Sequence, residues 1–179
     1  MRMAIDLCGE LLRLRAILEE LIQFAESHHI EEIKIVNAFI KHLQNKTEMF
    51  IDEEVFKIPD GIEIKRGMVF WVNFGVNIGQ EFGGKHPAIV LKVGGKTAIV
   101  APLSSQEPTV EQKNSGTYIE VDKVYNLRNM KRWCNVLNSM PVSLQRFDFN
   151  SSSGNVKGYV LDRLNEGIKK SCVWERKPI

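Results

Sequence analysis

The sequence predicts an α+β protein in which an N-terminal α-helical hairpin precedes a small β-barrel or sandwich that ends in a helix. In the first fifty residues, apolar side chains recur at steps of three and four, the period of an amphipathic helix. After Pro59-Asp60-Gly61 the apolar residues come in short runs between glycine turns, which is typical of strands. We therefore place a helical extension at residues 1–58 and a second domain at residues 62–174.

The helical extension is expected to contain two helices that are separated near Ser27-His28-His29. The apolar positions of its first helix include Leu11, Leu14, Leu18 and Leu21. Ser27 is expected to accept backbone hydrogen bonds as the N-cap of the second helix, whose first turn carries Glu31 and Glu32. A two-helix hairpin is too small to be stable alone, so we expect its apolar face to pack on the rest of the chain or on a second copy.

The second domain is expected to begin with three strands and to end with a helix. The three apolar runs are Val69–Val72, Ala88–Leu91 and Thr97–Ala101, and the paired glycines before Thr97 predict a hairpin turn. Further strands are expected at Tyr118–Val121 and within residues 133–142. The polar segment at residues 106–116 reads as a mobile loop, and the final helix is expected over about residues 156–170.

The overall composition is that of an ordinary soluble protein without an evident metal or redox motif. There are 24 Lys and Arg against 22 Asp and Glu, so the net charge of +2 identifies no nucleic-acid binder by itself. Cys8, Cys134 and Cys172 are far apart and form no CxxC pair, which argues against a zinc knuckle and fits a reducing cytoplasm. Acidic residues interrupt the apolar N-terminus, so neither a signal peptide nor a membrane span is expected.

Three segments carry a resemblance to a known family. They are KRGMVFWVNF at residues 65–74, GQEFGGKHPAIVL at residues 79–91 and IVAPLSSQ at residues 99–106. Their order resembles the MazF/PemK toxins, whose domains begin with RGD-x-x-W/Y-x-D/N-F and continue with G-x-E-x-G-G-x-R-P-A-x-V-L. Tyr118–Val121 and Leu144–Phe147 match later parts of that family's pattern. The resemblance covers about three-fifths of the chain and leaves out the N-terminal helices.

The resemblance implies a small SH3-like β-barrel with a C-terminal helix. Members of the family are usually homodimers that cut single-stranded RNA at short sequences without a metal, and a partner antitoxin generally neutralises them. We therefore expect a cytoplasmic, metal-independent endoribonuclease without a cofactor, with RNA, an antitoxin and a second copy as its partners. The alternative is a MazF-like module that has lost catalysis and binds RNA or a protein partner.

The resemblance also points to three catalytic candidates, His86, Ser104 and Glu81. His86 stands where the family usually has its catalytic arginine, and it is either a general acid or base or a structural residue. Ser104 aligns with a hydroxyl that contacts the scissile phosphate, although a serine in a turn often bonds only its own backbone. Glu81 matches an acid in the loop between the first two strands.

RNA-binding candidates come from the same segments and from a basic stretch near Trp133. They are Lys85, Ser105, Gln106, Arg128, Lys131 and Arg132. Basic residues next to an aromatic ring can follow a phosphate backbone and stack a base, whereas a solvated loop has the same composition.

Two positions depart from the family's pattern. Met68 replaces the usual aspartate of the first strand, and residues 138–142 contain no counterpart of a second key arginine. These departures bear on cleavage more than on the fold. The hairpin, which is rich in acidic residues, is a further candidate for a cover that restrains the barrel.

Overall fold

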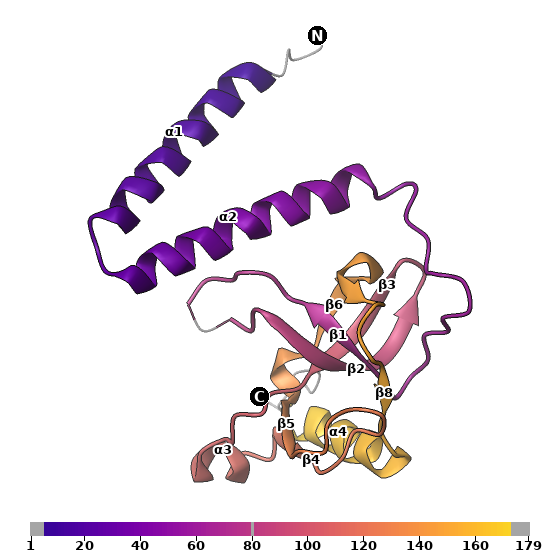
Figure 1. The fold of residues 1–179 in the computed structure, drawn as a ribbon. Helices are drawn as coiled ribbons and strands as arrows, with labels where there is room; N and C mark the ends of the chain where they lie inside the picture. The colour runs from indigo at the N-terminus through magenta and orange to yellow at the C-terminus, as the bar shows by residue number, and fades with distance from the viewer. Residues whose placement is uncertain (1–5, 80, 173–179) are drawn as a thin grey trace, which may run out of the picture. The chain divides into compact units, whose positions relative to one another are not determined.

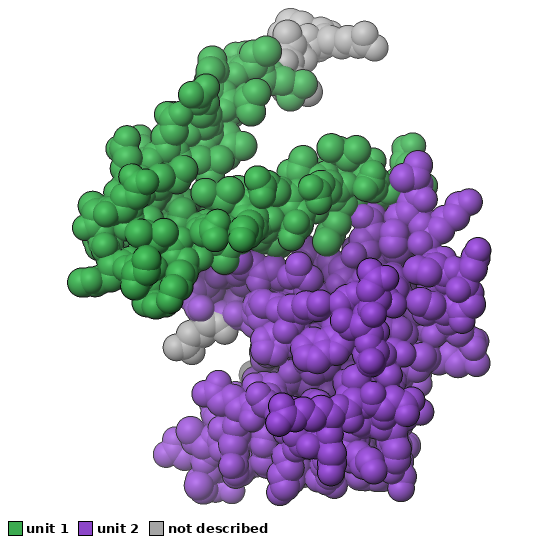
Figure 2. All heavy atoms as spheres, viewed as in Figure 1, with its two compact units in different colours: residues 1–54 green, residues 55–179 purple. Residues whose placement is uncertain are grey.

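The computed structural model describes residues 6–79 and 81–172, and the chain forms two compact units (Figures 1 and 2). Unit 1 is Met1–Glu54 and unit 2 is Val55–Ile179. The outer limits of the two predicted domains, residues 1–5 and 173–174, lie outside the described residues. Among the described residues, no helix combines the length and the apolar composition needed to cross a membrane.

The order of elements confirms the predicted α+β class. Unit 1 contains α1 (Leu7–Glu26) and α2 (Ile30–Ile51). Unit 2 contains β1 (Met68–Asn73), β2 (Lys85–Gly94), β3 (Thr97–Pro102), α3 (Val110–Asn114), β4 (Tyr118–Val121), β5 (Arg132–Asn135), the 3₁₀-helix η1 (Val136–Asn138), β6 (Met140–Ser143), the 3₁₀-helix η2 (Leu144–Arg146), β7 (Phe147–Asp148), β8 (Gly154–Asn155) and α4 (Gly158–Lys170).

The two helices of unit 1 form a hairpin, but their caps differ from the prediction. Asp6 is the N-cap of α1, because its Oδ1 accepts the N–H of Gly9 at 2.9 Å. The prediction that Ser27 caps α2 is wrong. Ser27 lies in the right-handed helical region as the C-cap of α1 and donates its hydroxyl to the carbonyl of Phe24, while His29 is the N-cap of α2.

Unit 2 is built on an antiparallel sheet that curls into a half-barrel (Figure 1). Its strand order is β6-β3-β2-β1-β7, β8 also pairs with β1, and β4 and β5 form a separate two-stranded sheet. The register of β1 and β2 places Val72 opposite His86 and Asn73 opposite Lys85. The register of β2 and β3 shifts between Val90 and Lys92, which is a β-bulge.

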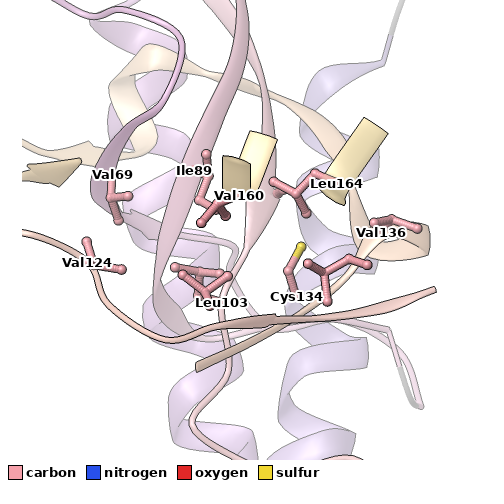
Figure 3. Packing of buried hydrophobic residues seen from close by; sticks show 11 residues of the cluster. Val69, Ile89, Leu103, Val124, Cys134, Val136, Val160 and Leu164 are labelled. Atoms are coloured by element: carbon pink, nitrogen blue, oxygen red, sulfur yellow. The ribbon is translucent and has the colours of Figure 1, made fainter. Parts of the chain in front are cut away.

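Two apolar cores stabilise unit 2 because alternate residues of its strands point to opposite faces. Val69 and Ile89 belong to the core that α4 covers with Val160 and Leu164, and Figure 3 shows these side chains converging. The second core lies on the other face of the sheet, where Phe70 packs with other aromatic and β-branched residues. Leu164 has 1% of its surface exposed, so its burial contributes about 2 kcal/mol.

Two connecting segments differ from the prediction. The expected mobile loop at residues 106–116 contains the one-turn helix α3. Thr109 and Gln112 form a capping box there, each side chain accepting the other's backbone N–H, and this arrangement explains the helical turn. The stretch 133–142 is interrupted by η1 because the side chain of Asn135 accepts the N–H of Leu137 and turns the backbone.

Candidate functional site

The three catalytic candidates lie around one end of the curled sheet. His86 is the second residue of β2, directly after the β1–β2 loop, and Ser104 follows the end of β3. Ala88 pairs with Pro102, and the N–H of Leu103 donates to the carbonyl of Pro87 at 2.8 Å. Extending this register by two residues places Ser104 opposite His86 on the neighbouring strand.

A surface cavity of about 210 Å³ opens at this end of the sheet. Aromatic rings, carboxamides and the Ser104 side chain share its wall. The lining residues are Phe82, Pro102, Ser104, Gln106, Glu107, Pro108, Gln112, Tyr118, Trp133, Asn135 and Asn138. A cavity with flat rings and paired donors and acceptors has the chemistry needed to hold a nucleobase.

The imidazole of His86 is not among the lining residues of this cavity, but it contacts the ring of Phe82, which is one of them. The two ring centroids are 4.7 Å apart, and the Phe82 ring in turn meets Phe74 edge-on at 5.2 Å. Gly84 makes the sharp entry into β2 possible, because its φ of +81° is a conformation that favours glycine. Its N–H donates to the carbonyl of Gly75 at 2.7 Å and thereby closes the β1–β2 loop.

Ser104 is held in place by its backbone and its hydroxyl. Its N–H donates to the carbonyl of Trp133 at 2.9 Å, and the Trp133 N–H donates back at 2.8 Å. The Ser104 Oγ accepts the N–H of Gln106 at 3.0 Å, as in a serine turn. This bond uses one lone pair and leaves the hydroxyl proton available. Ser105 and Gln106 are exposed beside it.

Alternate residues of β5 point to opposite sides of the strand, one toward the cavity and the other toward the interior. Trp133 and Asn135 are half-buried and line the cavity, whereas Arg132 and Cys134 are buried. Arg132 is 4% exposed and donates to the carbonyls of Met130 and Arg128 at 3.2 and 3.1 Å. Burial lowers the pKa of its guanidinium. Arg132 therefore stabilises the preceding loop and is not exposed for binding at the surface.

The other basic candidates are exposed or paired. Arg128 is exposed, and the ammonium of Lys131 lies 2.9 Å from the carboxylate of Glu120. Their hydrogen bond raises the pKa of Lys131 and lowers the pKa of Glu120. Lys85 pairs with Asp148 at 2.6 Å.

The Lys85–Asp148 pair crosses β1 and connects β2 to β7. Asp148 also accepts the hydroxyl of Ser151 at 2.5 Å and the N–H of Asn150 at 2.9 Å. The hydrogen bond from Lys85 is the largest of several causes that hold the pKa of Asp148 well below its usual range. Lys85 is thus engaged within the sheet. Glu81 is exposed in the β1–β2 loop, where its carboxylate accepts the N–H of Ile78 at 3.3 Å.

Sequence reasoning did not single out one arginine that the fold brings to this region. Arg146 ends η2, and its Nη1 donates to the carbonyl of Asn73 at 3.1 Å. The next residue, Phe147, pairs with Val72 on one side of β1, and His86 pairs with Val72 on the other. In the sequence, only the resemblance of Leu144–Phe147 to the family's pattern pointed to this arginine. The pairing of β7 with β1 shows that Arg146 lies beside β1.

The carboxamides of the cavity were also outside the sequence prediction. Asn135 lines the cavity because it shares a strand face with Trp133, and Asn138 lines it because η1 turns the chain back. Within residues 6–79 and 81–172 there is no group of three or more His, Cys, Asp or Glu side chains placed to hold a metal ion.

Comparison with known proteins gives one family match. The model of the family "PemK-like, MazF-like toxin of type II toxin-antitoxin system" matches residues 65–172. No curated protein matches the chain.

Several solved structures are similar in part. The Mycobacterium tuberculosis toxin MazF-mt6 is 13% identical, with 60% of this chain and 98% of that chain covered and a TM-score of 0.44. MazF from Deinococcus radiodurans is 15% identical, with 65% and 97% covered and a TM-score of 0.45. A MazE–MazF structure from the same organism is 14% identical, with 64% and 100% covered and a TM-score of 0.46.

Proposed function

This chain belongs to the family of PemK-like, MazF-like toxins of type II toxin–antitoxin systems, and we propose that it is a metal-independent endoribonuclease that cleaves single-stranded RNA. The observation that supports this proposal best is the cavity at the end of the sheet. Ser104 lies in its wall, and His86 contacts the ring of Phe82, another residue of the wall. The proposal thus rests on a hydroxyl in the cavity wall and on an imidazole that contacts one ring of the same wall.

The cavity suits an unpaired base better than a base in a duplex. Tyr118 and Trp133 offer ring faces for stacking, and Asn135 and Asn138 offer both a donor and an acceptor. Such groups reach a base only when it is unstacked from its neighbours. Single-stranded RNA is therefore the substrate class that we assign to this cavity.

The proposed reaction uses the substrate's own 2′-hydroxyl. A base removes the 2′-OH proton, the 2′-oxygen attacks the adjacent phosphorus, and a P–O2′ bond forms while the P–O5′ bond breaks. The leaving O5′ takes a proton, so the products are a 2′,3′-cyclic phosphate and a 5′-hydroxyl. We assign proton transfer to His86, because an imidazole can serve as a general base and as a general acid. The Ser104 hydroxyl would donate to a phosphate oxygen.

A cation is also required near the phosphate as negative charge develops. In many relatives an arginine follows the double glycine, whereas His86 stands there in this chain. We propose that Arg146 and Lys113 supply part of this charge. Lys113 lies over the Trp133 ring, 5.0 Å from its centroid, and pairs with Glu107 at the cavity wall.

One observation favours the second candidate function, an RNA-binding module without cleavage. The chain has His86 in place of the family's arginine, and Lys85, the cation next to it in the sequence, is paired with Asp148. A groove with stacking rings but a weakened cation binds RNA more readily than it cleaves it.

We further propose the partners that the family implies. The solved Deinococcus radiodurans structure pairs a MazF with a MazE, and a comparable antitoxin is expected to bind this barrel unit. Assembly of two barrel units and a cytoplasmic location are part of the same proposal. Glu81 and the exposed Arg128 are assigned to the rim of the RNA groove, and Arg132 supports the loop behind it.

The experiment is cleavage of a long unstructured RNA by the purified full chain in EDTA. His86→Ala and Ser104→Ala are compared with two controls, His29→Ala and Ser152→Ala, which remove a histidine and a serine side chain away from the cavity. We expect cleavage by the wild type and both controls, with losses of at least about 100-fold in the two cavity variants. RNA binding without cleavage in the folded wild type would favour the binding module. Equal cleavage by all five proteins would remove the site from the proposal.

A further inference from the structure

Helix α1 carries an apolar stripe with the spacing of a coiled coil. The stripe alternates steps of four and three residues through Leu7, Leu11, Leu14, Leu18, Leu21 and Ala25. In heptad notation these residues occupy the d and a positions in turn, which is the pattern that packs one helix against another along a continuous seam. The family match at residues 65–172 does not include α1.

The two halves of this stripe have different surroundings. At the C-terminal half, Ala25 is 2% exposed and packs against α2, where Val36 is 8% exposed. At the N-terminal half, the exposed fractions are 72% for Leu7, 66% for Leu11 and 49% for Leu14. The same seam is therefore covered by a helix along one half and open along the other. The four- and three-residue spacing continues through the open half, so a second amphipathic helix is the kind of partner that would pack there.

We propose that this open half of α1 pairs with α1 of a second copy of the chain, with the two helices parallel. Leu7, Leu11 and Leu14 would then pack against the same residues of the partner. The contact is two-fold symmetric and uses one surface twice. It joins two copies through the helical hairpin and does not depend on the function proposed for the cavity.

Charged residues beside the seam specify both the partner and its direction. Glu10 precedes Leu11 and occupies a g position, and Arg15 follows Leu14 and occupies an e position. Arg15 lies five positions after Glu10, which is the spacing at which g of one helix meets e of a parallel partner. A second copy in the parallel direction therefore provides two Glu10–Arg15 pairs. In an antiparallel pair e positions face e positions and g positions face g positions, so Glu10 would not meet Arg15.

Both charges are free to change partner. Glu10 pairs with Arg13 at 2.7 Å and Arg15 pairs with Glu19 at 2.8 Å, all within α1 and all with more than half of the side chain exposed. Exposed ion pairs within a helix are weak, so exchanging them for pairs between copies costs little.

The first test is oxidative cross-linking of the full chain. In a background with Cys8→Ser and Cys172→Ser, Leu14→Cys places a thiol in the seam and Ala16→Cys places one on the opposite face of the helix. We expect Leu14→Cys to form disulfide-linked dimers at least about tenfold faster than Ala16→Cys, because d residues of parallel helices face each other. Equal rates, as when the hairpin lies on its own barrel unit or on another protein, would overturn the proposal.

A charge-exchange experiment tests direction without changing the apolar seam. Leu14→Cys chains that also carry Glu10→Lys are mixed with Leu14→Cys chains that carry Arg15→Glu, and the disulfides equilibrate in a thiol buffer. The mixed dimer has two attractive pairs and each homodimer has two repulsive ones. Each variant keeps its own pairs within the helix, so their sum is unchanged when two homodimers exchange chains to form two mixed dimers. With equal amounts of the two chains, random pairing gives as much mixed dimer as the two homodimers together, and we expect the mixed dimer to outnumber them roughly fivefold. A statistical mixture would contradict the parallel arrangement.

Discussion

Arg132 provides a sharp contrast between a structural and an RNA-binding cation. The sequence places it in a basic stretch that suggests phosphate contacts, but its guanidinium is buried and donates to two backbone carbonyls. We expect Arg132→Ala to destabilise unit 2 and to leave the RNA affinity of the remaining folded protein unchanged.

The size of this effect follows from the contacts that are lost. Arg132→Ala removes two hydrogen bonds from a charged donor and leaves the carbonyls of Met130 and Arg128 without that partner. Each bond contributes about 1.5 kcal/mol, but relief of the desolvation cost of the buried charge offsets part of this sum. A net loss of about 2 kcal/mol is expected, which corresponds to a decrease in Tm of roughly 4–8 °C for a chain of this size.

The assay is thermal unfolding followed by circular dichroism, with RNA binding measured on the folded protein at 20 °C or another fixed temperature well below the Tm. Arg128→Ala is the matched control, because Arg128 is exposed and its side chain is expected to contribute little to stability. An unchanged Tm for Arg132→Ala together with weaker RNA binding would refute the assignment and return Arg132 to the RNA groove.

Three further predictions concern the same unit. Asp148→Asn is expected to lower the free energy of unfolding by roughly 1–2 kcal/mol at pH 7. The pKa of Asp148 is lowered in the folded state, so the stability that its carboxylate contributes is present above the ordinary pKa of 3.8 and is lost as the pH falls below that value. The free energies of unfolding in urea of the wild type and Asp148→Asn should therefore become similar in acid. Gly154→Ala should prevent stable folding, because an added Cβ would lie 2.5 Å from the carbonyl of Tyr125, and limited proteolysis would detect this. Iodoacetamide should label Cys134 only after unfolding, because burial raises the pKa of its thiol to about 12, and mass spectrometry of the native protein would reveal any exception.

The sequence was sufficient for features that depend on local periodicity. The three- and four-residue steps predicted both N-terminal helices, and Gly94-Gly95 correctly marked the hairpin between β2 and β3. The capping box of α3 was also a local signal, since Thr109 precedes Gln112 by three residues, but the polar composition of the segment outweighed it.

The arrangement of the candidate site depends on pairings that no local pattern encodes. Lys85 and Asp148 are 63 residues apart in the sequence and meet because β2 and β7 flank β1. Arg132 points inward because alternate residues of β5 face the interior. If the register of β5 shifted by one residue, Trp133 would point inward and Arg132 would face the cavity. The family resemblance pointed to His86 and Ser104 as candidates, and only the fold shows that Ser104 lines the cavity while His86 contacts the Phe82 ring of its wall.

The most direct test of the central claim uses one cleavable RNA oligonucleotide and a copy with a 2′-deoxy sugar at the 5′ side of the scissile bond. The wild-type protein in EDTA should convert the first into fragments with a 2′,3′-cyclic phosphate and a 5′-hydroxyl, and the second should bind with similar affinity but stay intact. Cleavage of the deoxy copy, or 5′-phosphate ends on the products, would contradict attack by the 2′-hydroxyl and with it the roles proposed for His86 and Ser104.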